Sequence, residues 1–461
     1  MNRPLTANGS GRKWSSSLMF FAAAIGSAVG ISNIWKFTYV AGENGGGAFV
    51  LVYVFALAFV ALPALTAEFL IGRRGGASVV KTMENLAAND GVSPAWRYYG
   101  LMAVIGAFLA LSFYSVVAGW TIDYFLVALS RGFKGATADS AGEALSALLA
   151  NPVRLIASQL AFVGLTVTVV AGGIRGGLER VLKWLTPGLF VILLILLIYA
   201  VVAGDFRTAF EFLFIPDFSR LNATTVLMAV GQAFFSLGVG LGVLMTIAAY
   251  MDSRTSILRA AAVVAFADGF VALLAGLAIF PIVFANNLSP AEGPGLIFAT
   301  LPVAFGQIPG GFVVGPLFFL LMVFAALTSA ITILETVVAW GEDYTRFSRK
   351  TIALATGLLL WLAGLATVFS FNIWQDFNPL PFIPALADKT IFGVLDYIVS
   401  NLMMPLGGML VAILAGWGLS RKATLSELGI RDGIVYRSWR LLVRYLVPAV
   451  IIALFLANLG N

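Results

Sequence analysis

Small and polar residues interrupt the first long apolar stretch of this chain. Residues 26–47 read GSAVGISNIWKFTYVAGENGGG, which places Asn33 and Lys36 inside a segment of membrane-spanning length. Hydrocarbon offers no water to backbone N–H and C=O groups, so a spanning helix breaks only where it is buried in protein or lines a cavity. Polar side chains at that depth are energetically unfavourable and usually functional. The stretch therefore predicts a binding site near the middle of a membrane.

The composition indicates an integral membrane protein of helical type. Hydrophobic residues make up 60% of the 461 residues and charged residues only 11%, whereas average domains are about 25% charged. Apolar runs of roughly 20 residues recur, while a β-barrel would show alternating segments of about 10 residues. The chain contains no His and no Cys. Thiol chemistry, disulfides, histidine bases and most transition-metal sites are thereby excluded.

Hydropathy and turn signals predict eleven spans. They cover residues 15–39, 45–71, 97–128, 153–171, 178–203, 222–251, 256–285, 314–343, 350–371, 390–419 and 439–458. With the N-terminus inside, 21 Lys and Arg residues fall in cytoplasmic segments and six in external ones. Because membrane proteins concentrate Lys and Arg on the cytoplasmic side, we expect a multi-pass protein of the plasma (inner) membrane with a cytoplasmic N-terminus and an external C-terminus.

A second interrupted span supports an internal repeat. Residues 231–242 read GQAFFSLGVGLG, with four glycines around Ser236, and each glycine destabilises a helix by about 1 kcal/mol. We expect this helix to unwind near 236–240. Paired interruptions in corresponding spans point to a transport site between inverted repeats. The chain 1–461 is therefore predicted to form one domain, with repeats at 15–203 and 222–419 and an extra helix at 439–458. The apolar external loop 286–313 is predicted to fold back as a lid.

With its two interrupted spans, the chain resembles the neurotransmitter:sodium symporter family and its bacterial leucine-transporter-like members. The resemblance rests on six motifs in order along the chain: GSAVGISNIWKF, AGENGGGAF, IGRRGG, FYSVVAGW, GQAFFSLGVG and AALTSA. It implies an all-α membrane fold with unwound first and sixth helices in two inverted five-helix repeats. It also implies Na⁺-coupled amino-acid symport with two sodium sites. Neither an enzymatic activity nor a nucleic-acid partner is expected.

The resemblance implies two sets of sodium ligands, since Na⁺ prefers oxygen atoms. The first set is the Ala28 carbonyl, Asn33, Ser236, Asp268 and the substrate carboxylate. The second set is the carbonyls of Gly26, Val29 and Ala325 with the hydroxyls of Thr328 and Ser329. Two simpler interpretations stand beside these. Ser and Thr in membrane helices usually bond back to their own helix, and an Asn can serve as a contact between helices.

Asp268 is a lone carboxylate in the apolar run AVVAFADGFVALL. At that depth it must be paired, protonated or bound to a cation. The family often has Asn at this position, and its chloride-dependent members place a bound anion nearby. The resemblance therefore implies that Asp268 supplies the negative charge itself and that transport does not depend on chloride.

Gly30 occupies the position at which monoamine carriers of the family have an Asp, so the substrate is expected to bring its own carboxylate. The resemblance implies that this carboxylate meets the N–H groups of Ile31 and Ser32, at a helix N-terminus that favours anions, and the Tyr114 hydroxyl. The ammonium would meet the carbonyls of Ala28, Phe235 and Ser236. The expected wall is apolar and consists of Ala110, Tyr114, Phe235, Gly238, Leu241, Ser329 and Ile333.

Three wall residues predict a large substrate. Gly238, Leu241 and Ala110 replace the Ser, Phe and Val of leucine-transporting members, and we expect these changes to enlarge the pocket. Bulky hydrophobic or aromatic amino acids such as Trp, Tyr, Phe and Leu are the predicted substrates. The alternative is that Gly238 and Gly240 only permit close helix packing.

Charged residues near the span ends are candidate gates. The resemblance pairs Lys36 with Asp396 on the outside, where relatives often have Arg in place of Lys36. On the inside it pairs Asp343 with Arg12, or with Lys13 in its place, near Tyr250. The alternative is that these are ordinary cations at helix ends. The alternative function is a non-transporting amino-acid sensor, which would lack a sodium site or a gate pair.

Gly177 and Pro187 enclose nine residues of span five. Glycine is flexible and proline removes a backbone hydrogen bond. Unwinding between them is expected to admit water to the second sodium site.

Overall fold

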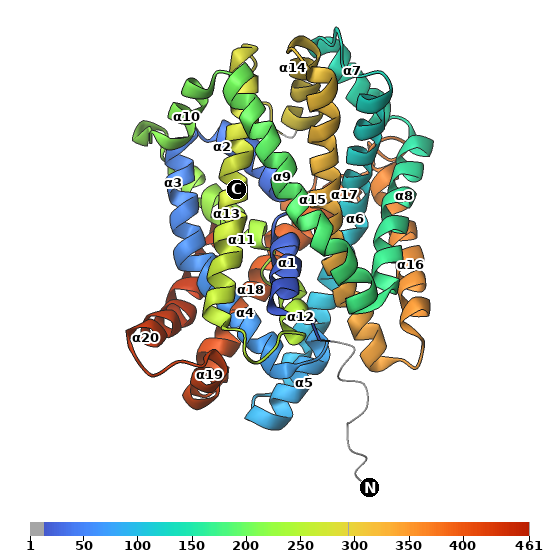
Figure 1. Ribbon diagram of the computed structural model, residues 1–461. Helices are drawn as coiled ribbons and strands as arrows, with labels where there is room; N and C mark the ends of the chain where they lie inside the picture. Colours follow the sequence, from blue (N-terminus) through green and yellow to red (C-terminus); the bar gives the residue numbers. More distant parts are fainter. Residues whose placement is uncertain (1–12, 294, 461) are drawn as a thin grey trace.

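The computed structural model describes residues 13–293 and 295–460, with side chains to residue 457, and every regular element in them is a helix (Figure 1). Nine helices in these ranges are long and apolar enough to cross a membrane. They are Gly47–Gly75 (α3 and α4), Pro94–Ser130 (α6), Pro152–Ala171 (α8), Ile174–Ala203 (α9), Ile257–Ala285 (α13), Gly311–Tyr344 (α15), Arg349–Phe369 (α16), Ile391–Gly418 (α17 and α18) and Ile434–Ala457 (α20 and α21). All nine correspond to predicted spans, with ends shifted by a few residues.

The first predicted span is a bent pair of helices. Helix α1 (Ser17–Ala28) and the segment Ser32–Glu43, which includes α2 (Phe37–Glu43), pass the same test together and meet at 48°. Between them, Val29 is extended (φ −77°, ψ 95°). The helix is thus broken where the sequence predicts.

The sixth predicted span is divided by three left-handed glycines. Helix α11 (Ala223–Leu237) ends at Gly238 (φ +64°), and α12 (Val243–Ala249) begins after Gly240 (φ +106°) and Gly242 (φ +69°). These backbone angles are open to glycine and unfavourable for other residues. The unwound region is therefore 238–242, two residues beyond the predicted 236–240. Ser236 remains in the last turn of α11, because the left-handed conformation starts only at Gly238.

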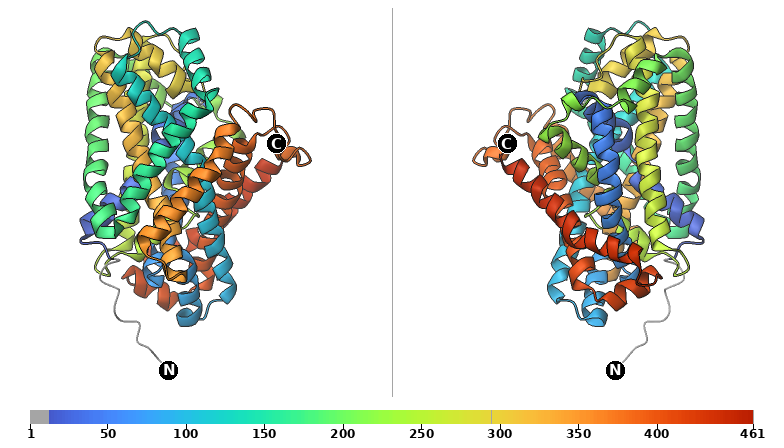
Figure 2. Two further views of the ribbon diagram at one scale, coloured as in Figure 1. Left: turned by 90° about the vertical axis from the view of Figure 1, so that its right-hand side faces the viewer. Right: turned by 90° about the vertical axis from the view of Figure 1, so that its left-hand side faces the viewer.

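The two ends of the bundle carry different short helices (Figures 1 and 2). Helices α5 (Val79–Asp90), α19 (Arg421–Leu428) and α20 (Ile434–Leu441) lie at one end, called here the inner end. Helices α7 (Ala138–Leu149), α10 (Phe206–Phe214) and α14 (Leu301–Gln307) lie at the opposite, outer end.

The loop predicted as a lid is packed onto the outer end. It forms α14 and a preceding helical turn, and Leu296, Ile297 and Phe298 in that turn are buried. The Tyr124 hydroxyl donates to the Phe298 carbonyl at 2.8 Å. This burial explains the apolar composition of the loop.

Gly240 holds the unwound segment against α18 (Met404–Ile413). A Cβ atom at Gly240 would lie 2.2 Å from the Met404 carbonyl oxygen and 2.7 Å from the Gly408 nitrogen. Backbone atoms cannot yield as a flexible side chain can, so the glycine is required by space as well as by its φ angle.

Gly240→Ala is expected to lower the melting temperature of the purified protein and to abolish ligand binding. The strained backbone alone is unfavourable by about 1–3 kcal/mol. Gly231→Ala is the matched control, since a Cβ at this position of α11 meets open space and alanine favours a helix. Equal melting temperatures for the two variants would contradict the packing described here.

Candidate functional site

Three polar side chains join the two helix breaks inside the bundle. Asn33 Nδ2 donates to Ser236 Oγ at 2.9 Å and to Asp268 Oδ1 at 2.7 Å. The Ser236 hydroxyl donates to the Asp268 carboxylate, with O···O distances of 2.8 and 2.9 Å. Asn33 and Asp268 have no exposed surface. The three side chains of the first predicted sodium set therefore meet, and they come from spans one, six and seven.

Two further contacts complete this cluster. The Tyr53 hydroxyl lies 3.4 Å from Asp268 Oδ2, and the Gly30 N–H donates to Asn33 Oδ1 at 2.9 Å. Asn33 therefore satisfies a backbone donor that the broken helix leaves without an intrahelical partner. The sequence analysis missed Tyr53, because a tyrosine in the apolar run FVLVYVF cannot be distinguished there from a core aromatic residue.

The second predicted sodium set lies along α15 beside α1. A Cβ at Gly26 would lie 3.3 Å from Thr328 Cβ, so these two residues are in direct contact. The Thr328 hydroxyl donates to its own helix at the carbonyls of Phe324 (3.0 Å) and Ala325 (3.1 Å). Ser329 Oγ donates to the Ser27 carbonyl at 3.2 Å. Val29, the remaining member, is buried at the break itself.

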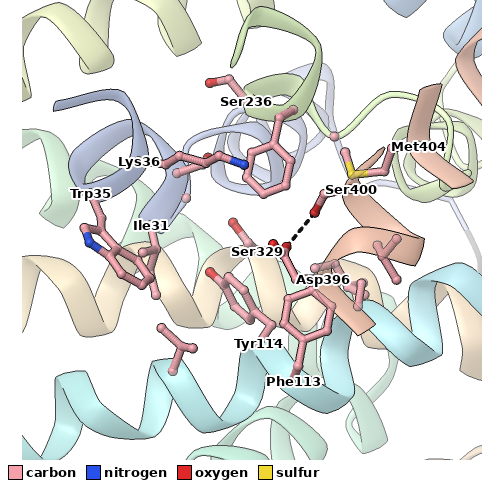
Figure 3. A pocket seen from close by; sticks show the side chains of 18 of the residues that line it. Ile31, Trp35, Lys36, Phe113, Tyr114, Ser236, Ser329, Asp396, Ser400 and Met404 are labelled. Atoms are coloured by element: carbon pink, nitrogen blue, oxygen red, sulfur yellow. Dashed lines mark hydrogen bonds between the residues drawn. The ribbon is translucent and has the colours of Figure 1, made fainter. Parts of the chain in front are cut away.

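A cavity of about 440 Å³ is lined by Ser236 of the first cluster and Ser329 of the second (Figure 3). All eleven residues predicted to contact a substrate line it. They are Ala28, Ile31, Ser32, Ala110, Tyr114, Phe235, Ser236, Gly238, Leu241, Ser329 and Ile333. A Cβ at Gly238 would meet nothing within 4 Å. Gly238 therefore leaves room in the cavity, whereas Gly240 does permit close packing, against Met404 and Gly408 of α18.

Part of the cavity wall was missed by the sequence analysis. Val399, Ser400 and Met404 of span ten line it, as do Phe113 and Phe392. Valine, methionine and phenylalanine are common throughout an apolar span, so no signal in the sequence separates these from lipid-facing positions. The cavity also reaches Leu149 of α7 and Phe298, which places its mouth toward the outer end.

The predicted outer gate residues face the same cavity without joining. Lys36 Nζ lies 3.7 Å from the centroid of the Phe235 ring, a cation–π contact. Asp396 instead accepts a hydrogen bond from Ser400 Oγ at 2.7 Å (Figure 3). Lys36 and Asp396 form no ion pair with each other in the described part of the chain. This conformation has its outer gate unpaired.

The start of the chain closes the inner end. Trp14 Nε1 donates to the Ile247 carbonyl at 2.9 Å, and the Trp14 N–H donates to the Tyr250 carbonyl at 3.2 Å. The Ser15 N–H donates to Glu179 Oε1 at 2.6 Å. Glu179 lies between Gly177 and Pro187 of span five, where the structure is helical throughout.

The predicted inner gate pair cannot be placed as a pair, because Arg12 lies outside the described residues. Its partner Asp343 accepts a hydrogen bond from the Ser78 N–H at 3.0 Å. Tyr250 donates to Glu335 Oε1 at 3.0 Å, and Arg349 pairs with Glu335. Glu335 was missed, although a lone carboxylate in the run ITILETVVAW is the same kind of signal that identified Asp268.

The comparisons with known proteins agree with this geometry. The sequence profile of the sodium:neurotransmitter symporter family matches residues 11–140 and 147–375. The protein belongs to this family. YhdH, an uncharacterized sodium-dependent transporter of Bacillus subtilis, is 37% identical over 97% of this chain and 98% of its own. An uncharacterized sodium-dependent transporter of Haemophilus influenzae is 31% identical over 99% of this chain and 100% of its own.

A solved structure extends the likeness to the fold. The crystal structure of MhsT in complex with L-phenylalanine is 39% identical, with a TM-score of 0.88, and the match covers 97% of this chain and 99% of that one. The predicted family is thus confirmed. The protein is a multi-pass membrane transporter of a sodium-dependent family, not an enzyme.

Glu179→Ala is expected to loosen the inner end, because it removes a hydrogen bond to a charged group, worth about 1.5–3 kcal/mol. The chain has no cysteine, so Ala24→Cys, on the buried face of α1, provides a single reactive thiol. Its maleimide labelling should be about tenfold faster in the Glu179→Ala background. Arg180→Ala, at the exposed next position, is the control, and equal rates in both backgrounds would contradict this role for Glu179.

Proposed function

We propose that the protein is a Na⁺-coupled symporter that carries bulky hydrophobic and aromatic amino acids into the cell by alternating access. One observation carries the proposal: Ser236, which bonds to Asn33 and Asp268 at the two helix breaks, also lines an apolar cavity of about 440 Å³. A substrate there would lie beside groups able to hold a cation. MhsT, the structural neighbour, was crystallised with L-phenylalanine, which supports an amino acid of this class.

The substrate's α-carboxylate would sit at the N–H groups of Ile31 and Ser32, which begin the outer half of span one, and near the Tyr114 hydroxyl. The carbonyls of Ala28, Phe235 and Ser236 would accept hydrogen bonds from its ammonium. A Cβ at Gly30 would lie 2.6 Å from Ser329 Oγ. A side chain at Gly30 would require the Ser329 hydroxyl to move. Because Gly30 offers no acidic group of the kind used by monoamine carriers, the substrate would supply the carboxylate.

The first sodium ion would be held by the Ala28 carbonyl, Asn33, Ser236, Asp268 and the substrate carboxylate. Asn33 Nδ2 points at Asp268, so its amide would turn over to present Oδ1 to the ion. The second ion would be held by the carbonyls of Gly26, Val29 and Ala325 and by the hydroxyls of Thr328 and Ser329. These hydroxyls would exchange their present helix and Ser27 contacts for the ion. Asp268 supplies a fixed negative charge, which makes chloride unnecessary.

The proposed cycle starts from the arrangement seen here, with the inner end closed and Lys36 apart from Asp396. Sodium and substrate fill the site, Lys36 moves from Phe235 to Asp396, and the outer path closes. Release of the Arg12–Asp343 pair and unwinding of residues 177–187 would then open the inner path. Each positive charge that moves inward through a membrane potential of 100 mV contributes about 2.3 kcal/mol to the driving force for transport.

In this proposal the chain has eleven spans. Ten of them form two inverted repeats, 15–203 and 222–419, and helix 439–458 is the eleventh. The N-terminus is cytoplasmic.

Uptake into proteoliposomes tests the proposal. Radiolabelled tryptophan and leucine are offered with external Na⁺ or K⁺, and with chloride or gluconate. Accumulation that requires Na⁺ and is unchanged in gluconate is expected. Binding without accumulation would identify a sensor and contradict transport. Strong stimulation by chloride would contradict the role given to Asp268.

The double variant Ala110→Val, Leu241→Phe is expected to shift preference from tryptophan toward leucine. Both residues line the cavity. In an apolar pocket, one extra or missing methylene changes the discrimination between two substrates by about 10–200-fold. The ratio of tryptophan to leucine uptake should fall at least tenfold. Leu194→Phe, on an exposed face of α9, controls for a general effect of added bulk. An unchanged ratio in the double variant would contradict the assigned wall.

A further inference from the structure

The segment between spans ten and eleven holds much of the protein's positive charge. Residues 419–446 contain six basic and two acidic residues, a net charge of +4 in a chain of net charge +6. The basic residues are Arg421, Lys422, Arg431, Arg437, Arg440 and Arg444, and the acidic ones are Glu427 and Asp432. The segment includes α19 and α20 at the inner end, at the side of the bundle (Figure 2).

Both acidic residues of this segment already have partners. Glu427 accepts from Arg73 Nε at 2.6 Å and lies 3.5 Å from Arg74 Nη1, and both arginines belong to α4 (Leu62–Gly75). Asp432 pairs with Arg421 and with Arg437. Neither carboxylate is therefore available to neutralise the two remaining exposed cations.

Those two cations border an open groove of about 810 Å³ formed by α19 and the residues 429–432 that follow it. The ion-paired Arg421 and Asp432 line the same groove. Lys422 and Arg431 line it, and both are exposed and without an ion pair among the residues described here. Leu425 and Ile430 line the same groove and are half-buried. The groove thus combines positive charge with an apolar surface.

The groove lies next to a helix with the character of a membrane-surface helix. α20 continues through residues 442–446 into α21 (Val447–Gly460), as part of the span Ile434–Ala457. Ile434 is 80% exposed and Val435 60%, while Tyr436 and Trp439 face inward. Exposed aliphatic side chains beside arginines are typical of helices lying in the headgroup region. The groove thus lies beside a helix whose exposed face suits the headgroup region.

We propose that this groove binds the headgroup of an anionic phospholipid from the leaflet at the inner end. Lys422 and Arg431 would contact the phosphate, and Leu425 and Ile430 would contact the glycerol and the first acyl carbons. Juxtamembrane basic clusters attract anionic lipids of the cytoplasmic leaflet. A free phosphate ion would use the cations alone, so the apolar side of the groove favours a lipid. The inference is independent of which substrate the transporter carries.

Lipid retention by the purified protein tests the proposal. The full chain is reconstituted in nanodiscs of phosphatidylcholine and phosphatidylglycerol, extracted gently, and analysed by native mass spectrometry. The wild type should retain phosphatidylglycerol in preference to phosphatidylcholine. The double variant Lys422→Gln, Arg431→Gln should bind phosphatidylglycerol about 30-fold more weakly. This factor follows because each basic residue near the membrane surface contributes about 1 kcal/mol to the binding of anionic lipid.

Arg346→Gln, Lys350→Gln is the matched control, since it removes two exposed cations from the inner ends of α15 and α16. It should retain phosphatidylglycerol as the wild type does, and melting curves should show that both double variants are folded. Equal retention by the two double variants would overturn the proposal. So would equal retention of the two lipids by the wild type. Displacement of phosphatidylglycerol by inorganic phosphate would identify a free-anion site and would also overturn it.

Discussion

The contact of Asn33 with Ser236 and Asp268 is the interaction on which the rest of the structure depends. Breaking two helices inside a membrane leaves backbone donors and acceptors without partners, and each is strongly unfavourable in hydrocarbon. Asn33 bonds its own broken helix at the Gly30 N–H and also reaches spans six and seven. Asn33 thus satisfies a backbone group at the first break and also holds the first break next to the second. The cavity lies where these two breaks meet.

The two ends of the bundle are held by different kinds of contact. At the inner end, Trp14 donates hydrogen bonds to the carbonyls of Ile247 and Tyr250, and the Ser15 N–H donates to Glu179. Arg349 forms an ion pair with Glu335, which also accepts a hydrogen bond from Tyr250. At the outer end, Lys36 rests on Phe235 while Asp396 bonds within its own helix. The inner contacts include hydrogen bonds and an ion pair between elements, whereas the two outer gate residues make a cation–π contact and a hydrogen bond within one helix. Opening toward the outer side is therefore the arrangement that these contacts favour.

Most of the fold and the cavity wall could be predicted from the sequence, because the membrane makes each polar or glycine-rich interruption informative. The spans, the break after Ala28 and the eleven cavity residues follow from such interruptions and from the family motifs. The second break lies later than expected, since only φ angles distinguish Gly238 from the helical Ser236. Tyr53 and Met404 were missed because an aromatic or apolar side chain in an apolar span has no distinguishing pattern. Their roles arise from packing between distant segments.

Reciprocal binding of Na⁺ and L-phenylalanine is the most direct measurement of whether the joined breaks form one shared site. The dissociation constant of phenylalanine is measured on the purified protein at increasing Na⁺, with choline replacing Na⁺ at constant ionic strength. If Asn33, Ser236 and Asp268 hold an ion beside the substrate, the dissociation constant should fall steeply as Na⁺ rises, and phenylalanine should tighten Na⁺ binding by the same factor. A phenylalanine affinity that does not change with Na⁺ would contradict a shared site.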